Sequence, residues 1–243
     1  MRPRRPEFRP DPELTREEME RLQRDLAAEA RFTDDGSFSD SPLVVGVDQA
    51  FPEDRAVSAI VAMRDGEVVE RASAETDLSI PYIPGLLSFR EGESILAAFE
   101  ALEAEPDLAL FDGSGRIHFR QAGLATHMGV TLDLPSVGVA KSLLCGRLSN
   151  PPEEPFSEGT RVPIVADGRV DLPEGTVLGY AVQTRQYEGN SRHINPLYVS
   201  PGHRMSAETA ASLAEAHCAG YKLPEPIRLA DQYAGELARE ANR

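Results

Sequence analysis

Three acidic residues, Asp48, Glu91 and Asp112, occupy positions where a folded chain normally places apolar side chains. Asp48 closes the apolar run LVVGVDQAF and, in the alternation of a strand, shares the face of Val44. Glu91 follows Leu87 by four residues, so it lies on the apolar stripe of an expected helix. Asp112 ends the apolar run DLALFD, at the carboxyl end of a strand, where open α/β sheets place their sites.

Each of these acids has an ordinary explanation when it is taken alone. An aspartate at a strand end commonly forms a turn, and an inward glutamate can pair with an arginine such as Arg90 or Arg120. Three carboxylates brought into one cluster, however, would repel each other unless cations bound there. Oxygen ligands favour Mg²⁺ or Mn²⁺ over zinc, and a metal held by carboxylates is suited to phosphodiester hydrolysis.

Two basic side chains extend this hypothesis. Lys141 follows the expected strand SVGVA, so its ammonium group is predicted to stand at a strand end near the acids. The chain has only one other lysine, Lys222, against 23 arginines, which indicates either chance or a need for a compact point charge that grips a phosphate. His203 lies between a Pro-Gly pair and an expected helix, which predicts an exposed imidazole near the positive helix end.

The hydrophobic pattern predicts an α/β fold, with a mixed β-sheet that carries α-helices on its faces. Asp65-Gly66 is a tight-turn signal between two of the strands, and residues 146–160 are rich in Pro, Ser and Glu, which predicts a surface loop. The expected helices span 11–30, about 86–102, about 121–132 and 206–220, and the expected strands span 43–51, 56–63, 67–75, 107–112, 136–140, 161–165, 169–172 and 176–184, with 161–165 and 169–172 as a hairpin.

The composition indicates one domain over residues 11–243, preceded by a basic and flexible arm over residues 1–10. No apolar run is long enough to span a membrane and no signal peptide is evident, so we expect a soluble, cytoplasmic protein. Cys145 and Cys218 are expected to be small buried side chains without a disulfide. The net charge of -15 with few lysines is typical of proteins from salt-loving organisms, so it does not exclude a nucleic-acid partner.

One further segment, PYIPGLLSFREGE at residues 81–93, holds a tyrosine between two prolines just before the expected helix. Together with GVDQAF, LFDGSGRIHFRQAGLATHMGV, PSVGVAKSLL, PLYVSPGHRMS and YKLPEPIRLA, it resembles the endonuclease V (deoxyinosine 3′ endonuclease) family, from about Pro12 to Leu229. The resemblance implies an RNase H-like fold. It also implies metal-dependent cleavage at the second phosphodiester bond 3′ to a deaminated base, leaving 3′-hydroxyl and 5′-phosphate ends.

The resemblance also implies roles for individual residues. It makes Asp48, Glu91 and Asp112 the metal-binding acids, His203 an active-site histidine and Lys141 the phosphate-facing lysine. The substrate-binding residues that it implies are a wedge that enters the duplex beside the lesion, Pro81, Tyr82, Ile83 and Pro84, and a pocket for the rotated base near Gly85, Leu87, Gly113 and His118.

The expected cofactor is Mg²⁺, with Mn²⁺ as a substitute, and the expected protein is a monomer that acts on DNA containing deaminated bases. Three alternatives stay open. An enzyme of the same fold could act chiefly on inosine in RNA, because the metal chemistry would be unchanged. A non-catalytic binder of modified nucleic acid would need a damaged acid cluster, and a glycosylase would leave an abasic site instead of a nick.

Overall fold

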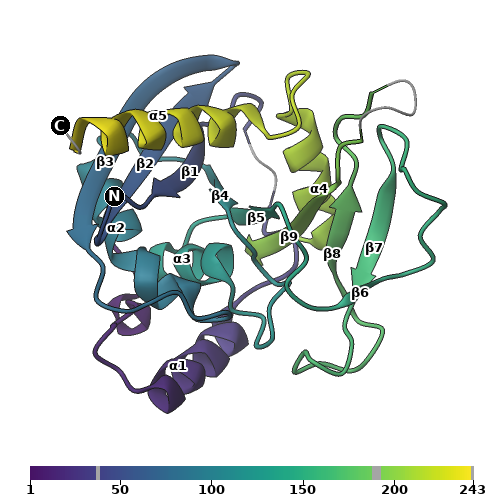
Figure 1. The fold of residues 1–243 in the computed structure, drawn as a ribbon, viewed down its shortest axis with the longest axis horizontal. Helices are drawn as coiled ribbons and strands as arrows, with labels where there is room; N and C mark the ends of the chain where they lie inside the picture. The colour runs from purple at the N-terminus through teal and green to yellow at the C-terminus, as the bar shows by residue number, and fades with distance from the viewer. Residues whose placement is uncertain (37–38, 188–192, 242–243) are drawn as a thin grey trace.

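A nine-stranded mixed sheet forms the centre of the computed structural model, which describes residues 1–36, 39–187 and 193–241 (Figure 1). Its strand order is β3-β2-β1-β4-β5-β9-β8-β7-β6, and helices cover both of its faces, which confirms the expected fold class. The elements are η1 (Pro6–Phe8), α1 (Arg16–Glu29), β1 (Val44–Ala50), β2 (Arg55–Arg64), β3 (Glu67–Asp77), α2 (Leu87–Ala101), β4 (Leu108–Asp112), α3 (Leu124–Leu132), β5 (Ser136–Ala140), β6 (Arg147–Leu148), β7 (Arg161–Val165), β8 (Val177–Val182), β9 (Leu197–His203), α4 (Ala207–Ala216) and α5 (Glu225–Ala241).

The first three strands form the antiparallel meander that the sequence predicts. Asp65 and Gly66 turn the chain between β2 and β3 with positive φ angles of 51° and 82°, as a two-residue hairpin turn requires. The chain then returns through α2 to β4 and through α3 to β5, and β1, β4 and β5 run parallel to one another. The carboxyl ends of these three strands therefore meet at one edge of the sheet.

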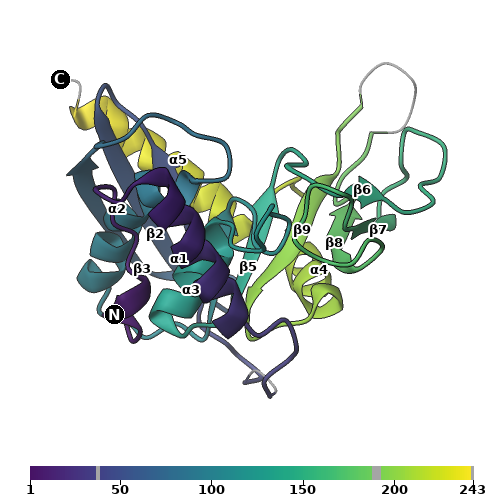
Figure 2. The same cartoon turned by 90° about the horizontal axis from the view of Figure 1, so that it is seen from below.

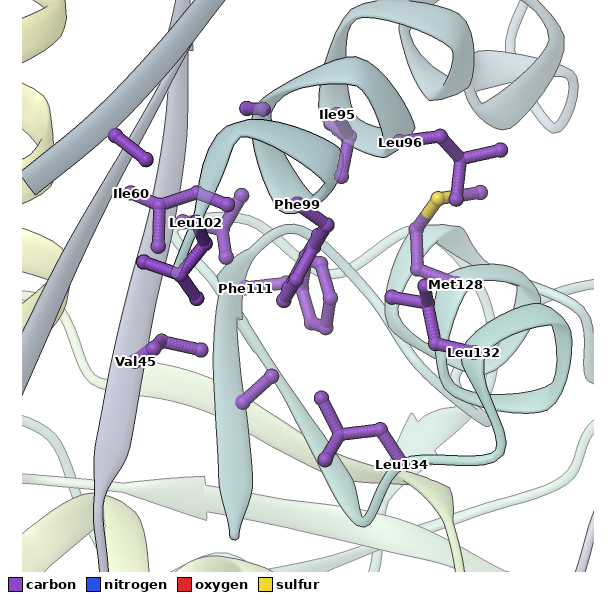
Figure 3. Packing of buried hydrophobic residues seen from close by; sticks show 14 of the residues in the cluster. Val45, Ile60, Ile95, Leu96, Phe99, Leu102, Phe111, Met128, Leu132 and Leu134 are labelled. Atoms are coloured by element: carbon purple, nitrogen blue, oxygen red, sulfur yellow. The ribbon is translucent and has the colours of Figure 1, made fainter. Parts of the chain in front are cut away.

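Side chains of β1 alternate between two hydrophobic cores. Val45 and Val47 pack with residues of α2 and α3. Figure 3 shows Val45 in this core together with Phe99 of α2 and Phe111 of β4, whose ring centroids lie 6.2 Å apart. Val44 packs on the opposite face with residues of α4 and α5. Figure 1 shows α5 on one side of the sheet and α1 and α3 on the other, and Figure 2 views the molecule from the side of α1. In the described part of the chain, no helix has the length and apolar character needed to cross a membrane.

Helix α5 lies very close to β1 at Gly46. A Cβ atom on Gly46 would come within 2.0 Å of the Pro226 carbonyl carbon and 2.4 Å of the Ile227 nitrogen. Because these are backbone atoms, they cannot move aside as a flexible side chain would. The missing side chain therefore fixes the spacing between β1 and α5.

Replacing Gly46 by alanine is expected to destabilise the fold by about 1 to 3 kcal/mol or more, because the added methyl group must push α5 away from β1. Urea unfolding would measure the change. Gly168→Ala serves as the control, since a Cβ atom there has no neighbour within 4 Å. Equal stability of the two variants would contradict the close packing.

The structure departs from the predicted hairpin over 161–172. β7 pairs with β8, and residues 169–172 form turns instead, in which the Asp171 nitrogen donates to the Phe119 carbonyl. The longer apolar strand β8 offers β7 five paired positions, more than a four-residue segment could supply. The predicted loop over 146–160 also contains the short strand β6, which extends the sheet, and the buried side chain of Phe156.

Residues 1–10 pack against the body of the protein, in contrast to the flexible arm expected from their charge. Phe8 is buried, and its carbonyl oxygen accepts a hydrogen bond from His127 Nε2 at 2.8 Å. The backbone nitrogens of Arg4 and Arg5 donate to the Thr131 carbonyl. The charge of this segment suggested a flexible arm. Its position is instead fixed by the burial of Phe8 and by the backbone hydrogen bonds to α3.

Candidate active site

The three predicted acids come together at the sheet edge. β1 and β4 are parallel neighbours with Val47 opposite Phe111, so Asp48 and Asp112 follow side by side. Glu91 reaches the same edge from the first turns of α2. Asp48 and Glu91 are 8% and 5% exposed, which is unusual for carboxylates that have no arginine bonded to them.

Burial and mutual repulsion change how these acids hold protons. Burial raises the pKa of Asp48 to about 8, and the charge of Asp112 adds to this shift. Burial likewise raises the pKa of Glu91 to about 8, where Arg90 opposes the shift and Asp112 supports it. The pKa of Asp112 is also raised, mainly by burial. Without a cation, the cluster therefore retains protons that ordinary carboxyl groups would have lost at neutral pH.

A fourth acid, Asp231, joins the cluster from α5. Its carboxyl group contributes to the raised pKa of Asp48, and its charge acts on both Asp112 and Lys141. The sequence analysis missed this residue, although the signal was present. Asp231 follows the buried Ile227 by four residues, so it lies beside the apolar stripe of α5 in the same way that Glu91 lies on that of α2. We call Asp48, Glu91, Asp112 and Asp231 the acid cluster.

Lys141 stands beside the acid cluster as predicted. It directly follows β5, and its Nζ atom lies 2.6 Å from Asp112 Oδ2. Burial disfavours the ammonium charge, but Asp112 more than offsets this effect and raises the pKa of Lys141 above its usual value. The lysine therefore carries a permanent positive charge next to the acids.

His203 does not lie at the acid cluster. His203 ends β9 and pairs with Ser136, the first residue of β5. Lys141 follows the opposite end of β5, and the two ends of this strand are about 13 Å apart. The His203 ring is buried between Arg31, whose backbone nitrogen donates to Nδ1 at 3.2 Å, and Asp133, whose Oδ1 lies 3.4 Å from Nε2. The structure therefore does not support an exposed active-site histidine at this position.

The strand assignment explains this difference. The prediction treated the Pro201-Gly202 pair as a loop, but β9 continues through it to His203. Pro201 is tolerated because β8 pairs with β9 only as far as Val199, so no partner on that side needs the missing N–H group.

A pocket of about 270 Å³ adjoins the acid cluster and contains most of the predicted base-binding residues. Its lining includes Tyr82, Gly85, Leu87, Gly113 and His118, together with Asp112 and Lys141 from the cluster. Tyr82 is 64% exposed, and Pro81 and Pro84 beside it are also exposed, whereas Ile83 is half-buried and packs towards α1.

The floor of the pocket is fixed by His118. Its Nδ1 atom accepts hydrogen bonds from the backbone nitrogens of Arg120 and Ala122, so its Nε2 atom carries the proton and donates to the Gly85 carbonyl at 3.0 Å. Burial lowers the pKa of His118 to about 4, so the ring is neutral. Gly85 takes a positive φ of 82°, which a side chain would disfavour.

The chemistry of the acid cluster fits a hard divalent cation. Its donors are all carboxylate oxygens, and burial together with the charge of Asp112 raises the pKa values of Asp48 and Glu91, so a bound cation would favour their charged forms. Within the described ranges, no group of three or more His, Cys, Asp or Glu side chains already has the arrangement that holds a metal ion. Binding would require the carboxylates to release their protons.

The raised pKa values predict that stability depends on pH in the metal-free protein. A carboxyl group with a pKa near 8 when folded and near 4 when unfolded stabilises the fold fully below pH 4, and this contribution disappears as the pH rises through 8. We therefore expect the Tm in EDTA to fall between pH 5 and 9. Asp48→Asn should flatten this fall, and an equally steep fall in that variant would contradict the assignment.

Comparisons with known proteins show the family to which this chain is similar. A family model for endonuclease V matches residues 22–232. The chain is 58% identical to the endonuclease V of the archaeon Haloarcula marismortui, over 96% of each chain. The endonuclease V structure from Streptomyces avermitilis superposes with a TM-score of 0.82 at 32% identity over the whole of both chains.

A structure of the Ciona intestinalis endonuclease V was solved with a DNA containing an inosine followed by a ribo-adenosine. It superposes with a TM-score of 0.75 at 28% identity, over 93% of this chain and 98% of that chain. These neighbours have the RNase H-like fold, which confirms that expectation. The length of the family match and the similarity to relatives leave one conclusion: the chain belongs to the endonuclease V family.

Proposed function

We propose that the protein is a metal-dependent endonuclease that cuts DNA at the second phosphodiester bond 3′ to a deaminated base, chiefly deoxyinosine, in DNA repair. The observation that carries this proposal is the position of the acid cluster and Lys141 directly beside a base-sized pocket. A pocket lined by both apolar and polar side chains suits a base rotated out of the helix, and the neighbouring acids suit hydrolysis of its backbone.

Recognition is assigned to the residues of the pocket. The neutral His118 ring has both nitrogens hydrogen-bonded to backbone groups, and it holds the Gly85 carbonyl in place as part of the pocket wall. Tyr82 projects from the rigid Pro81–Pro84 segment, where its ring can take the stacking position that the departed base leaves.

Hydrolysis is assigned to the acid cluster and Lys141. A Mg²⁺ ion held by the carboxylates would neutralise charge on the phosphate and lower the pKa of the attacking water. Lys141, which now pairs with Asp112, carries a fixed positive charge that would bind a phosphate oxygen of the substrate. Water attacks phosphorus and the 3′ oxygen leaves with a proton, so the products carry 3′-hydroxyl and 5′-phosphate ends.

The proposal is tested by incubating the protein with Mg²⁺ and a labelled duplex containing one deoxyinosine, and mapping the product at single-nucleotide resolution. A single cut at the second bond 3′ to the lesion is expected, with none in EDTA and retained cutting in Mn²⁺. An intact strand with an abasic site would identify a glycosylase, and binding without cutting would identify a non-catalytic reader.

RNA is a second candidate substrate, because the DNA bound to the Ciona relative carries a ribonucleotide after its inosine. Matched strands with deoxyinosine or inosine in an otherwise equal sequence separate the two functions. Faster single-turnover cleavage of the deoxyinosine strand supports DNA repair, and the reverse ratio supports an endoribonuclease.

A further inference from the structure

The fold brings the two lysines of the chain close enough for their charges to interact, although they are far apart in sequence. Lys222 belongs to the segment that joins α4 to α5, and its carbonyl oxygen accepts hydrogen bonds from Thr184 Oγ1 at 2.6 Å and from Cys218 Sγ at 3.5 Å. Thr184 is the second residue after the end of β8. β8 pairs with β9 and β9 with β5, so the backbone of Lys222 is held about two strand spacings, or about 10 Å, from the end of β5 that bears Lys141.

The electrostatics of Lys222 differ from those of Lys141. Burial and the nearby charge of Lys141 hold the pKa of Lys222 below its ordinary value. Lys141 is neutralised by Asp112, but the Lys222 side chain has no hydrogen bond or ion pair with any residue in the part of the chain that the structure describes.

An unpaired lysine is unexpected here, because the chain has 40 acidic side chains to 25 lysines and arginines. Two ammonium groups that repel each other at the edge of an active site are best satisfied by an anion from outside the protein. A nucleic-acid phosphate supplies such an anion, and a lysine binds it as a point charge.

The position of Lys222 gives the direction of the bound strand. The base pocket is built from Gln23 of α1, Leu87 of α2 and Leu124 of α3, which lie on one face of the sheet. Lys222 belongs to the segment that joins α4 to α5, and these two helices pack on the other face of the sheet (Figure 1). The acid cluster occupies the edge between these faces. A nucleic-acid strand that places its base in the pocket is cut on the 3′ side of that base. The strand therefore continues past the acids towards Lys222.

We propose that Lys222 binds a backbone phosphate on the 3′ side of the scissile bond and so positions the strand that leaves the acid cluster. This inference rests on the proposed function, because the polarity of the strand follows from a cut 3′ to the recognised base. Lys222 is thus a positioning residue for substrate and does not act on the reacting atoms.

Lys222→Gln is expected to reduce cleavage of a deoxyinosine duplex about tenfold at subsaturating enzyme, while saturating enzyme restores most of the rate. The plot of log affinity against log salt concentration should become less steep, by about the amount that one phosphate contact contributes to its slope. Lys222→Arg should keep most of the binding. Arg239→Gln is the matched control, since it removes one positive charge from the exposed far end of α5 and should change neither property.

The contact is located by replacing single phosphates with neutral methylphosphonates in the cut strand. At one phosphate 3′ to the scissile bond, the methylphosphonate should weaken cleavage by wild type and by Arg239→Gln about tenfold, but should cost Lys222→Gln almost nothing further. Melting temperatures of all variants establish that they are folded.

The outcomes separate the two proposals. One outcome is that wild type cuts the unmodified duplex while each methylphosphonate slows Lys222→Gln by the same factor as it slows wild type. In that case the Lys222 contact is wrong and the proposed function stands. Non-additivity only at phosphates 5′ to the lesion would also overturn the contact. If wild type leaves the duplex intact with Mg²⁺, the proposed function fails, and the Lys222 assignment fails with it.

Discussion

Replacing Asp48 by asparagine is expected to lower single-turnover cleavage of a deoxyinosine duplex by about a thousandfold or more. The amide keeps the shape of the side chain but removes the charge that holds the metal, and metal stabilisation of the transition state is worth several kcal/mol. Binding to the same duplex in EDTA should remain measurable, because the pocket is untouched. Gel-based cleavage and fluorescence anisotropy measure the two properties.

Asp133→Asn is the matched control for Asp48→Asn. Asp133 lies near His203 at the opposite end of the sheet, with a left-handed backbone that asparagine readily adopts. This variant should cleave at a rate close to that of wild type. Substantial cleavage by Asp48→Asn at saturating Mg²⁺ would remove Asp48 from the site, and a complete loss in Asp133→Asn would point to a role for the His203 region.

Tyr82→Ala is expected to impair cleavage by a loss of stacking of about 1 to 3 kcal/mol, or about tenfold for each 1.4 kcal/mol. The loss should be larger on a duplex than on a single strand, because only the duplex has neighbouring bases that restack when the wedge is absent. Single-turnover rates and dissociation constants on both substrates measure the difference. Tyr82→Phe keeps the ring and should retain the activity.

Equal losses on the duplex and the single strand would show that Tyr82 supports the pocket wall and does not act as a wedge. A loss of thermal stability in Tyr82→Ala would point the same way. The exposure of Tyr82 argues against this outcome, because 64% of the residue's surface is available to a ligand.

Local patterns in the sequence predicted the acids well for a physical reason. A carboxylate on an apolar strand face or helix stripe is costly to bury, so Asp48 and Glu91 could be recognised without knowledge of the fold. The parallel pairing of β1 with β4, which brings Asp48 beside Asp112, needed the three-dimensional structure. Strand boundaries in the first half of the chain followed from alternation and from the Asp65-Gly66 turn.

Other features depended on contacts that no local pattern records. His203 was placed in a loop because proline and glycine usually end strands, but pairing with β5 extends β9 through them. Asp231 was passed over because it follows an amphipathic stripe near the chain end, and only the contact of α5 with Gly46 carries it to Asp48. The basic segment over residues 1–10 is fixed by a single buried aromatic side chain, which charge counting cannot reveal.

The anchoring of the Pro81–Pro84 segment has a consequence for protein engineering. The Arg90 guanidinium donates to the Ile80 carbonyl at 2.7 Å on one side, and the Gln23 amide donates to the Gly85 carbonyl at 2.9 Å on the other. The Pro81–Pro84 segment between these two hydrogen bonds can therefore be replaced by other sequences, while the strands and helices that carry the acids keep their positions. Libraries confined to this segment would search for altered lesion preference without disturbing the hydrolytic machinery.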